Sequence, residues 1–158
     1  MSNLPRLLLA FITAVLLVSS FASIFQTQSN LAALQALGVP VPLDVRLSTM
    51  GLDLLGFAPT FALLAGAGFA VAMPLALWLS ARLRPWRWLI FPLAGAAAIW
   101  LALAVANALA PMPTLIAADR ELLGTLALMA CGSVGALLFA QLARRLRYKA
   151  QKNLPDSM

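Results

Sequence analysis

Four long apolar runs constrain this chain more than any other feature of its sequence. They cover residues 7–25, 59–81, 88–110 and 122–143, and none of them contains Asp, Glu, Lys or Arg. A transmembrane helix needs about 20 predominantly apolar residues. Inside a bilayer each backbone polar group must also be satisfied internally, which a helix achieves. The sequence therefore predicts an all-α integral membrane protein with four transmembrane helices.

The composition supports a single membrane domain. Charged residues make up 10% of the 158 residues and hydrophobic residues 63%, whereas a soluble domain is roughly 25% charged. Too few charges are present to cover a water-exposed surface. We expect residues 1–143 to form one up-down bundle of two hairpins, with a longer outer (periplasmic) segment at 26–58 and a basic cytoplasmic tail at 144–158.

The distribution of basic residues predicts the orientation. Nine of the 11 Lys and Arg residues flank one end of the four runs. Cytoplasmic segments carry such an excess, so we expect a bacterial-type inner (plasma) membrane protein with both termini cytoplasmic. Arginines at a membrane end also contact anionic headgroups. The membrane-surface basic residues of this sequence are Arg82, Arg84, Arg87, Arg144, Arg145 and Arg147.

The first run allows a second interpretation. It follows Arg6, and its small residues at Ser20–Ala22 resemble the cleavage site of a secretory signal. We interpret the run as a transmembrane span.

Several chemistries are disfavoured by the residues that the chain lacks. Histidine is absent and Cys131 is the single cysteine, so the usual haem ligand is missing and an intrachain disulfide is impossible. We expect no metal and no cofactor, and Cys131 to be a small core residue. Spans without ionisable residues argue against pumps, ion-coupled transporters and voltage sensors. The basic residues form only a short tail, so no nucleic acid is expected.

The outer segment contains signals for short helices. Residues 29–38 predict a separate amphipathic helix that ends at Gly38, and the prolines of 39–43 predict an extended path. Ser48 or Thr49 is a candidate cap for a second short helix.

A helix from residue 48 to residue 82 would reach about 52 Å, well beyond the hydrocarbon core of about 30 Å. It either projects outside the bilayer or breaks near Gly56 and Pro59, and the position of Pro59 favours a break or kink. Pro74 predicts a further kink nearer the inner end.

Residues 40–56, PVPLDVRLSTMGLDLLG, resemble residues 111–124, PMPTLIAADRELLG. Each has a Pro-x-Pro start and an acidic residue before Leu-Leu-Gly. The chain is therefore either two related hairpins of the same orientation or a set of similar Leu- and Ala-rich segments that arose by chance.

Small residues at every fourth position predict where the spans pack closely. The rows are Ala58, Ala62, Gly66, Ala70 and Pro74; Ala94, Ala98, Ala102, Ala106 and Ala110; and Gly124, Gly132, Ala136 and Ala140, with Leu128 interrupting the last. The run at 7–25 has no such row, so we expect it to be peripheral or to face a partner.

The polar residues of the outer end are the candidate contacts to a partner or ligand. Asp53 and Glu121 are expected at the N-terminal ends of helices, where the helix dipole alone stabilises a carboxylate. Asn107 is expected to hydrogen-bond a neighbouring span or a ligand headgroup. The candidate contacts are Asp44, Arg46, Asp53, Asn107, Asp119, Arg120 and Glu121.

These observations favour a non-catalytic accessory or scaffold subunit of an inner-membrane complex. Its expected partners are membrane lipids and other membrane protein subunits, or a second copy of the chain. The alternative is a carrier or binding protein for a lipid, a quinone or another apolar small molecule, with a cavity near Asn107. A membrane enzyme that uses the outer carboxylates is the least favoured class, since no catalytic residue spacing supports it.

Overall fold

The computed structural model describes residues 4–109 and 122–152, with side-chain surroundings up to Arg144. Within these ranges the chain is helical apart from its connections, and four helices are long and apolar enough to cross a membrane, as predicted. The helices are α1 (Leu4–Ala36), α2 (Leu43–Arg82), the short 3-10 helix η1 (Arg84–Trp86), α3 (Arg87–Leu109) and α4 (Leu122–Lys152).

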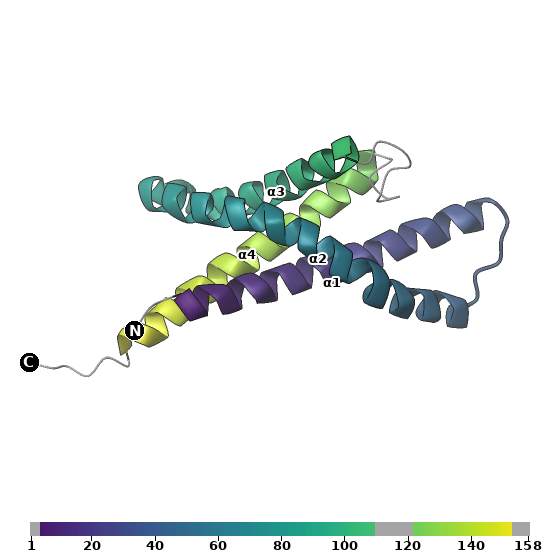
Figure 1. Ribbon diagram of the computed structural model, residues 1–158, viewed down its shortest axis with the longest axis horizontal. Coiled ribbons are helices and arrows are strands. Elements are labelled where there is room, and N and C mark those ends of the chain that lie inside the picture. Colours follow the sequence, from purple (N-terminus) through teal and green to yellow (C-terminus); the bar gives the residue numbers. More distant parts are fainter. Residues whose placement is uncertain (1–3, 110–121, 153–158) are drawn as a thin grey trace, which may run out of the picture.

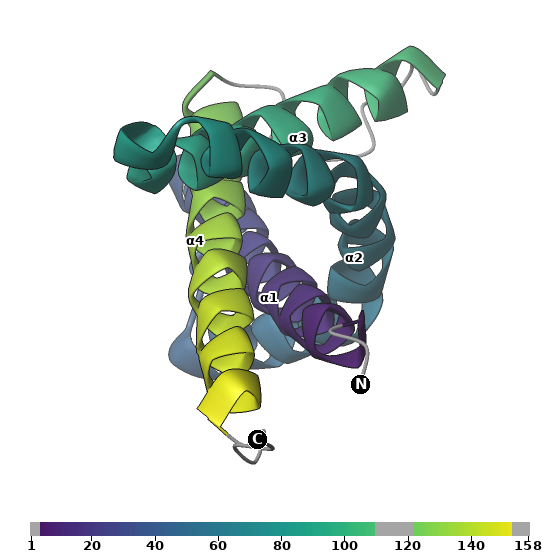
Figure 2. The same ribbon diagram turned by 90° about the vertical axis from the view of Figure 1, so that its left-hand side faces the viewer.

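All four long helices extend along the long axis of the molecule (Figure 1). The start of α1, the turn between α2 and α3, and the end of α4 lie at the left of this view. The main contacts join α1 to α2 and α4, and α3 to α2 and α4. A view along the bundle shows this arrangement end-on (Figure 2). Each long helix therefore packs against two others.

The first two helices are longer than predicted. The expected separate helix at 29–38 is the end of α1, which continues without interruption to Ala36 over 33 residues. The expected break near Gly56 and Pro59 is also absent, since α2 is one helix of 40 residues that contains Pro59 and Pro74. At 1.5 Å per residue, α1 is about 50 Å long and α2 about 60 Å. The end of α1 and the start of α2 form a hairpin, called the outer hairpin because it extends away from the rest of the bundle. It continues to the right of the ends of α3 and α4 (Figure 1).

Gly38 ends α1, as predicted. Its φ of 80° is the left-handed conformation that glycine adopts without steric cost. The backbone N–H of Val39 donates to the carbonyl of Leu34 at 3.2 Å, and that of Gly38 donates to Gln35 at 3.0 Å. This is the Schellman motif of a helix C-terminus. The chain then passes through 39–42, which has no helix, as the prolines predicted.

The predicted cap of the second helix was wrong. α2 begins at Leu43 after Pro42, which makes no side-chain cap hydrogen bond. The hydroxyls of Ser48 and Thr49 instead donate to the carbonyl of Val45, at 3.0 and 2.8 Å. Both residues therefore lie inside the helix, where such hydroxyls commonly bond to the preceding turn.

Glycines mark the closest approaches between helices. A Cβ added to Gly95 of α3 would clash with the carbonyl oxygen of Gly132 on α4, and one added to Gly132 would lie 2.6 Å from the carbonyl oxygen of Gly95. A Cβ on Gly68 of α2 would lie 2.9 Å from the carbonyl oxygen of Ala98 on α3. Small residues thus let the backbones touch, as expected within membranes.

A hydrogen bond joins α3 and α4 beside the glycine contact. The hydroxyl of Ser133 donates to the carbonyl of Pro92 at 2.9 Å, and it lies 3.2 Å from the carbonyl of Met129 in its own helix. Thr13, Ser19 and Ser20 bond within α1, where each hydroxyl donates to the carbonyl four residues earlier.

The small-residue rows were predicted with unequal success. The row of α4 is buried throughout, Leu128 included. In the row predicted for α3, Ala98 is buried and Ala94, Ala102 and Ala106 are half-buried, while Ala110 lies outside the described residues. In the row predicted for α2, Ala58 is buried and Ala62 and Gly66 are half-buried, but the prediction was wrong for Ala70 and Pro74, which are exposed. The buried face of α2 consists of Ala58, Phe61, Ala65, Phe69, Met73, Ala76 and Ser80.

The prediction that the first span is peripheral was also wrong. Ala10, Ala14, Val18 and Ala22 of α1 are fully buried. A Cβ added to Gly135 of α4 would clash with Val18. Three of the four buried residues are alanines at multiples of four positions, so α1 does carry small residues on its packed face, and Gly135 accommodates the larger Val18.

Candidate functional site

The polar contacts between α1 and α2 lie in the outer hairpin. The Thr27 hydroxyl is fully buried and lies 2.7 Å from Oδ2 of Asp53 on α2. It also lies 2.9 Å from the carbonyl of Ser23, so its one proton has two acceptors. The Ser23 hydroxyl is buried without a hydrogen-bond partner among the described residues. Asp53 is thus bound by a neighbouring helix inside the hairpin.

Two further polar contacts continue outward. Nε2 of Gln28 lies 3.1 Å from the sulfur of Met50, and the Arg46 guanidinium donates to Oε1 of Gln35 at 3.2 Å. Together these contacts hold α1 and α2 in one antiparallel register. We call these six residues the polar seam: Thr27, Gln28, Gln35, Arg46, Met50 and Asp53.

Two of the six residues of the polar seam, Arg46 and Asp53, were predicted contacts. The other four were not predicted: Thr27, Gln28, Gln35 and Met50. A signal was present, since residues 46, 50 and 53 are spaced by four and three and therefore share a helical face. Residues 28 and 35 are seven positions apart, which is about two helical turns, so they also share one face of their helix.

The predicted outer charges have different environments. Asp53 was expected at a helix N-terminus, but it lies in the interior of α2, where its Thr27 contact replaces the expected dipole stabilisation. Asp44 occupies the first turn of α2 and is exposed, a position that the helix dipole favours. Asn107 is half-buried. The remaining candidates Asp119, Arg120 and Glu121 lie outside the described residues. Leu122, Leu123 and Gly124, the second Leu-Leu-Gly, form the first turn of α4.

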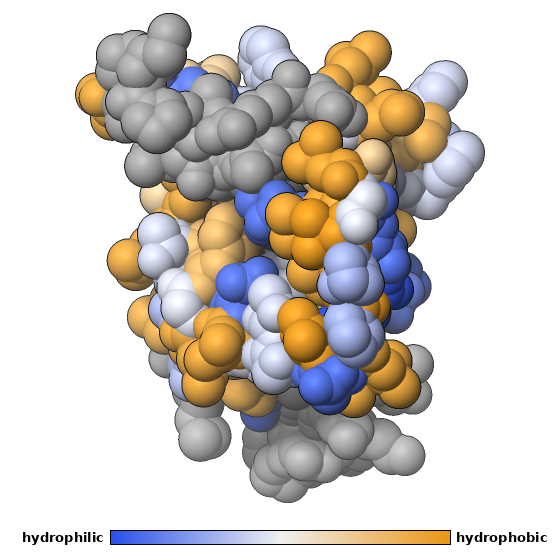
Figure 3. Space-filling model, turned by 90° about the vertical axis from the view of Figure 1, so that its right-hand side faces the viewer, coloured by the Kyte–Doolittle hydropathy of each residue, from blue (hydrophilic) through white to orange (hydrophobic). Residues whose placement is uncertain are grey.

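Large apolar side chains surround the polar seam. Leu37 is 80% exposed and Leu43 is 71% exposed, at the turn of the hairpin. Figure 3 looks onto this end and shows hydrophobic side chains among hydrophilic ones. We call the exposed group the hairpin apolar surface: Leu34, Leu37, Val39, Leu43, Val45, Leu47, Leu52, Leu54 and Leu55.

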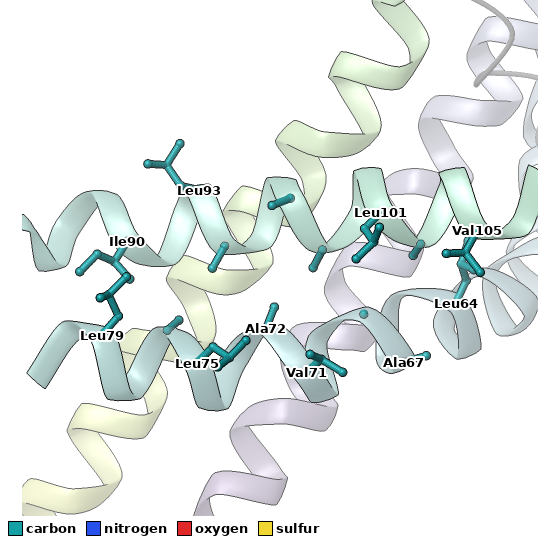
Figure 4. Close-up of a pocket in the computed structure, with 16 residues that line it drawn as sticks. Leu64, Ala67, Val71, Ala72, Leu75, Leu79, Ile90, Leu93, Leu101 and Val105 are labelled. Carbon is teal, nitrogen blue, oxygen red and sulfur yellow. The ribbon is translucent and has the colours of Figure 1, made fainter.

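A second feature is an apolar groove between α2 and α3, with a volume of about 670 Å³. At one end Leu79 lies beside Ile90, and at the other Leu64 lies beside Val105 (Figure 4). Asn107 follows Val105 by two residues but does not line the groove. The lining consists of Leu64, Ala67, Gly68, Val71, Ala72, Leu75, Ala76 and Leu79 of α2, and Ile90, Leu93, Ala94, Ala97, Ala98, Leu101, Ala102 and Val105 of α3.

The described membrane-surface arginines lie at the end of the bundle opposite the hairpin. Arg82, Arg84 and Arg87 are exposed at the turn between α2 and α3, and the Arg82 guanidinium lies 5.4 Å from the ring centre of Trp78, a cation–π contact. Arg144 is exposed near the end of the described part of α4. The side chains of Arg145 and Arg147 lie outside the described residues.

Within the described ranges, no three His, Cys, Asp or Glu residues come together as metal ligands. Cys131 is a free, half-buried thiol. No protein-family model, curated protein or solved structure matches this chain.

Proposed function

We propose that this protein is a non-catalytic integral membrane subunit that binds a partner protein through the hairpin apolar surface. The observation that carries the proposal is the length of α2 together with the exposed leucines at its outer end. A helix of 40 residues is about 60 Å long, whereas a bilayer with its headgroups is about 40–45 Å thick.

The arginines and tryptophans at the α2–α3 turn favour the inner bilayer boundary as the position of that end of α2. With an ordinary tilt of about 20°, the outer end of α2 then extends roughly 10 Å beyond the outer headgroups. Leu37 and Leu43 belong to this part and remain largely exposed. Exposed apolar patches outside lipid typically bind another protein.

The polar seam supports this role because it fixes the hairpin before any partner binds. Three side-chain contacts join α1 and α2 there. A preorganised surface loses less conformational entropy on binding than a flexible one. The orientation follows from the basic residues, which favour a bacterial-type inner membrane with both termini cytoplasmic. The hairpin would then be periplasmic.

Gentle solubilisation of the native membrane, followed by identification of co-purifying chains, tests the proposal. We expect one partner in fixed stoichiometry with the wild type and its loss from the double variant Leu37→Gln/Leu43→Gln. Leu83→Gln is the matched control, because Leu83 is 45% exposed at the opposite end of α2 and should retain the partner. Photo-crosslinkers placed at residues 37 and 43 should label the same partner chain.

A lone monomer at every detergent concentration would refute the proposal. Crosslinks from both positions to lipid alone would instead place the hairpin at the membrane surface. Crosslinks only to a second copy of the chain would also overturn the assignment, because the surface would then serve self-association.

A further inference from the structure

The α2–α3 groove ends at a group of arginines. Leu79 and Ile90 are its last lining residues on the two helices. Arg82 follows Leu79 by three positions, and Arg87 precedes Ile90 by three, so each arginine continues a groove-lining face by about one helical turn. Arg84 lies in η1 between them. The groove is therefore apolar along its length and positively charged at one end.

These positive charges lack acidic neighbours in the described protein. The acidic residues of the described ranges are Asp44 and Asp53, both in the outer hairpin. Arg84 and Arg87 are exposed. Arg82 packs on Trp78, a contact that leaves its charge uncompensated. An anionic group at this end would thus meet guanidinium groups that bind phosphate oxygens well.

The dimensions of the groove decide what enters it. Its lining extends over residues 64–79 and 90–105, which corresponds to about 22 Å along each helix. A groove of this length with a volume of about 670 Å³ accommodates an extended hydrocarbon chain. The arginines at its end favour an occupant that carries an anionic headgroup.

The length also fits a lipid chain. Half of the hydrocarbon core is about 15 Å thick, so an acyl chain that starts at the arginine end lies within the groove. All of the lining side chains are apolar, and they offer such a chain no hydrogen-bonding group. Basic pockets between transmembrane helices commonly hold anionic headgroups.

We propose that the α2–α3 groove is a specific binding site for an anionic phospholipid of the leaflet that faces the α2–α3 turn. One acyl chain occupies the groove, and the headgroup phosphate is bound by Arg84 and Arg87, with Arg82 adjacent. The site goes beyond the proposed accessory role and uses none of the hairpin residues, so each proposal can fail without the other.

Native mass spectrometry of the detergent-solubilised full chain, titrated with phosphatidylglycerol or phosphatidylcholine of the same acyl chains, tests the site. We expect the wild type to bind phosphatidylglycerol roughly tenfold more tightly. The double variant Arg84→Gln/Arg87→Gln should lose this preference and retain weak binding of both lipids. Arg144→Gln removes a charge from the same end of the bundle and should leave the preference unchanged.

The groove is tested separately by filling it. Ala97 is exposed and lines the groove, so Ala97→Leu should weaken the binding of both lipids severalfold. Ala104 is exposed on the same helix and does not line the groove, so Ala104→Leu is the matched control. Circular dichroism and gel filtration establish that each variant is folded.

Equal wild-type affinities for the two lipids would overturn the proposal. So would folded Ala97→Leu protein that binds phosphatidylglycerol as well as Ala104→Leu does, because the lipid would then contact only the surface arginines. Should Ala97→Leu fail to fold, Ala67→Leu fills the opposite wall of the groove and decides the same question.

Discussion

Gly95→Ala should destabilise the bundle, although alanine is a better helix former than glycine. The added Cβ would clash with the carbonyl oxygen of Gly132 and lie 2.6 Å from the Cβ of Ala136. The first of these is a backbone atom, so relief requires that α3 and α4 move apart. Overpacking of this kind costs about 1–3 kcal/mol. We expect a cost near the upper end of that range, because a backbone atom cannot rotate away as a side chain can.

Two smaller terms modify this value. Separation of the helices lengthens the hydrogen bond between Ser133 and Pro92, and interhelical hydrogen bonds in membranes contribute about 0.6 kcal/mol on average. Alanine has a higher helix propensity than glycine, which stabilises the variant by about 1 kcal/mol and offsets part of the overpacking cost. The net expected loss in the free energy of unfolding is about 2 kcal/mol.

Gly56→Ala is the matched control, because Gly56 lies within α2 and nothing is within 4 Å of the position of its added Cβ. The higher helix propensity of alanine should therefore stabilise the Gly56→Ala protein by up to about 1 kcal/mol. Both variants are measured against wild type by titrating sodium dodecyl sulfate into mixed micelles and following the loss of helix. The two substitutions should shift the midpoint in opposite directions. Equal shifts, or a stabilised Gly95→Ala protein, would refute direct backbone contact between α3 and α4.

Three further substitutions test other contacts. Ser133→Ala removes the bond to Pro92 and should lower the free energy of unfolding by about 0.6 kcal/mol in the same titration; no change would show that the bond contributes nothing. Thr27→Val removes the hydroxyl that contacts Asp53, so hydrogen exchange over residues 27–53 should accelerate, and unchanged protection would contradict the role of the polar seam. Gly38→Ala places a side chain at a φ of 80° and should cost about 1–2 kcal/mol, measured by thermal unfolding; an unaltered melting temperature would exclude that conformation.

The transmembrane helices were predictable because lipid imposes one strong rule. A long apolar segment must satisfy its own backbone hydrogen bonds, and apolar runs are visible in any sequence. The outer hairpin was not predictable in the same way. Capping residues such as Ser48 and a proline such as Pro59 are local signals for helix ends, but both lie inside the continuous helix α2. These local signals therefore did not determine where the helix begins or ends.

The position of α1 was missed because its row of small residues is incomplete. Ala10, Ala14 and Ala22 lie at multiples of four positions, but Val18 interrupts them. Val18 of α1 is fully buried because its partner position on α4 is Gly135. The groove between α2 and α3 was equally hidden, because empty space between two helices depends on their crossing and has no signature in either segment alone.

α2 belongs to both proposed surfaces, and this gives it the geometry of a lever. Its outer end carries leucines of the hairpin, its inner part forms one wall of the groove, and its contact with α3 at Gly68 lies within that wall. About 38 Å of helix separates Leu43 from this pivot, and about 21 Å separates the pivot from Arg82. A sideways displacement of the hairpin tip, if α2 tilted as a rigid rod, would move the arginine end by about half as much in the opposite direction.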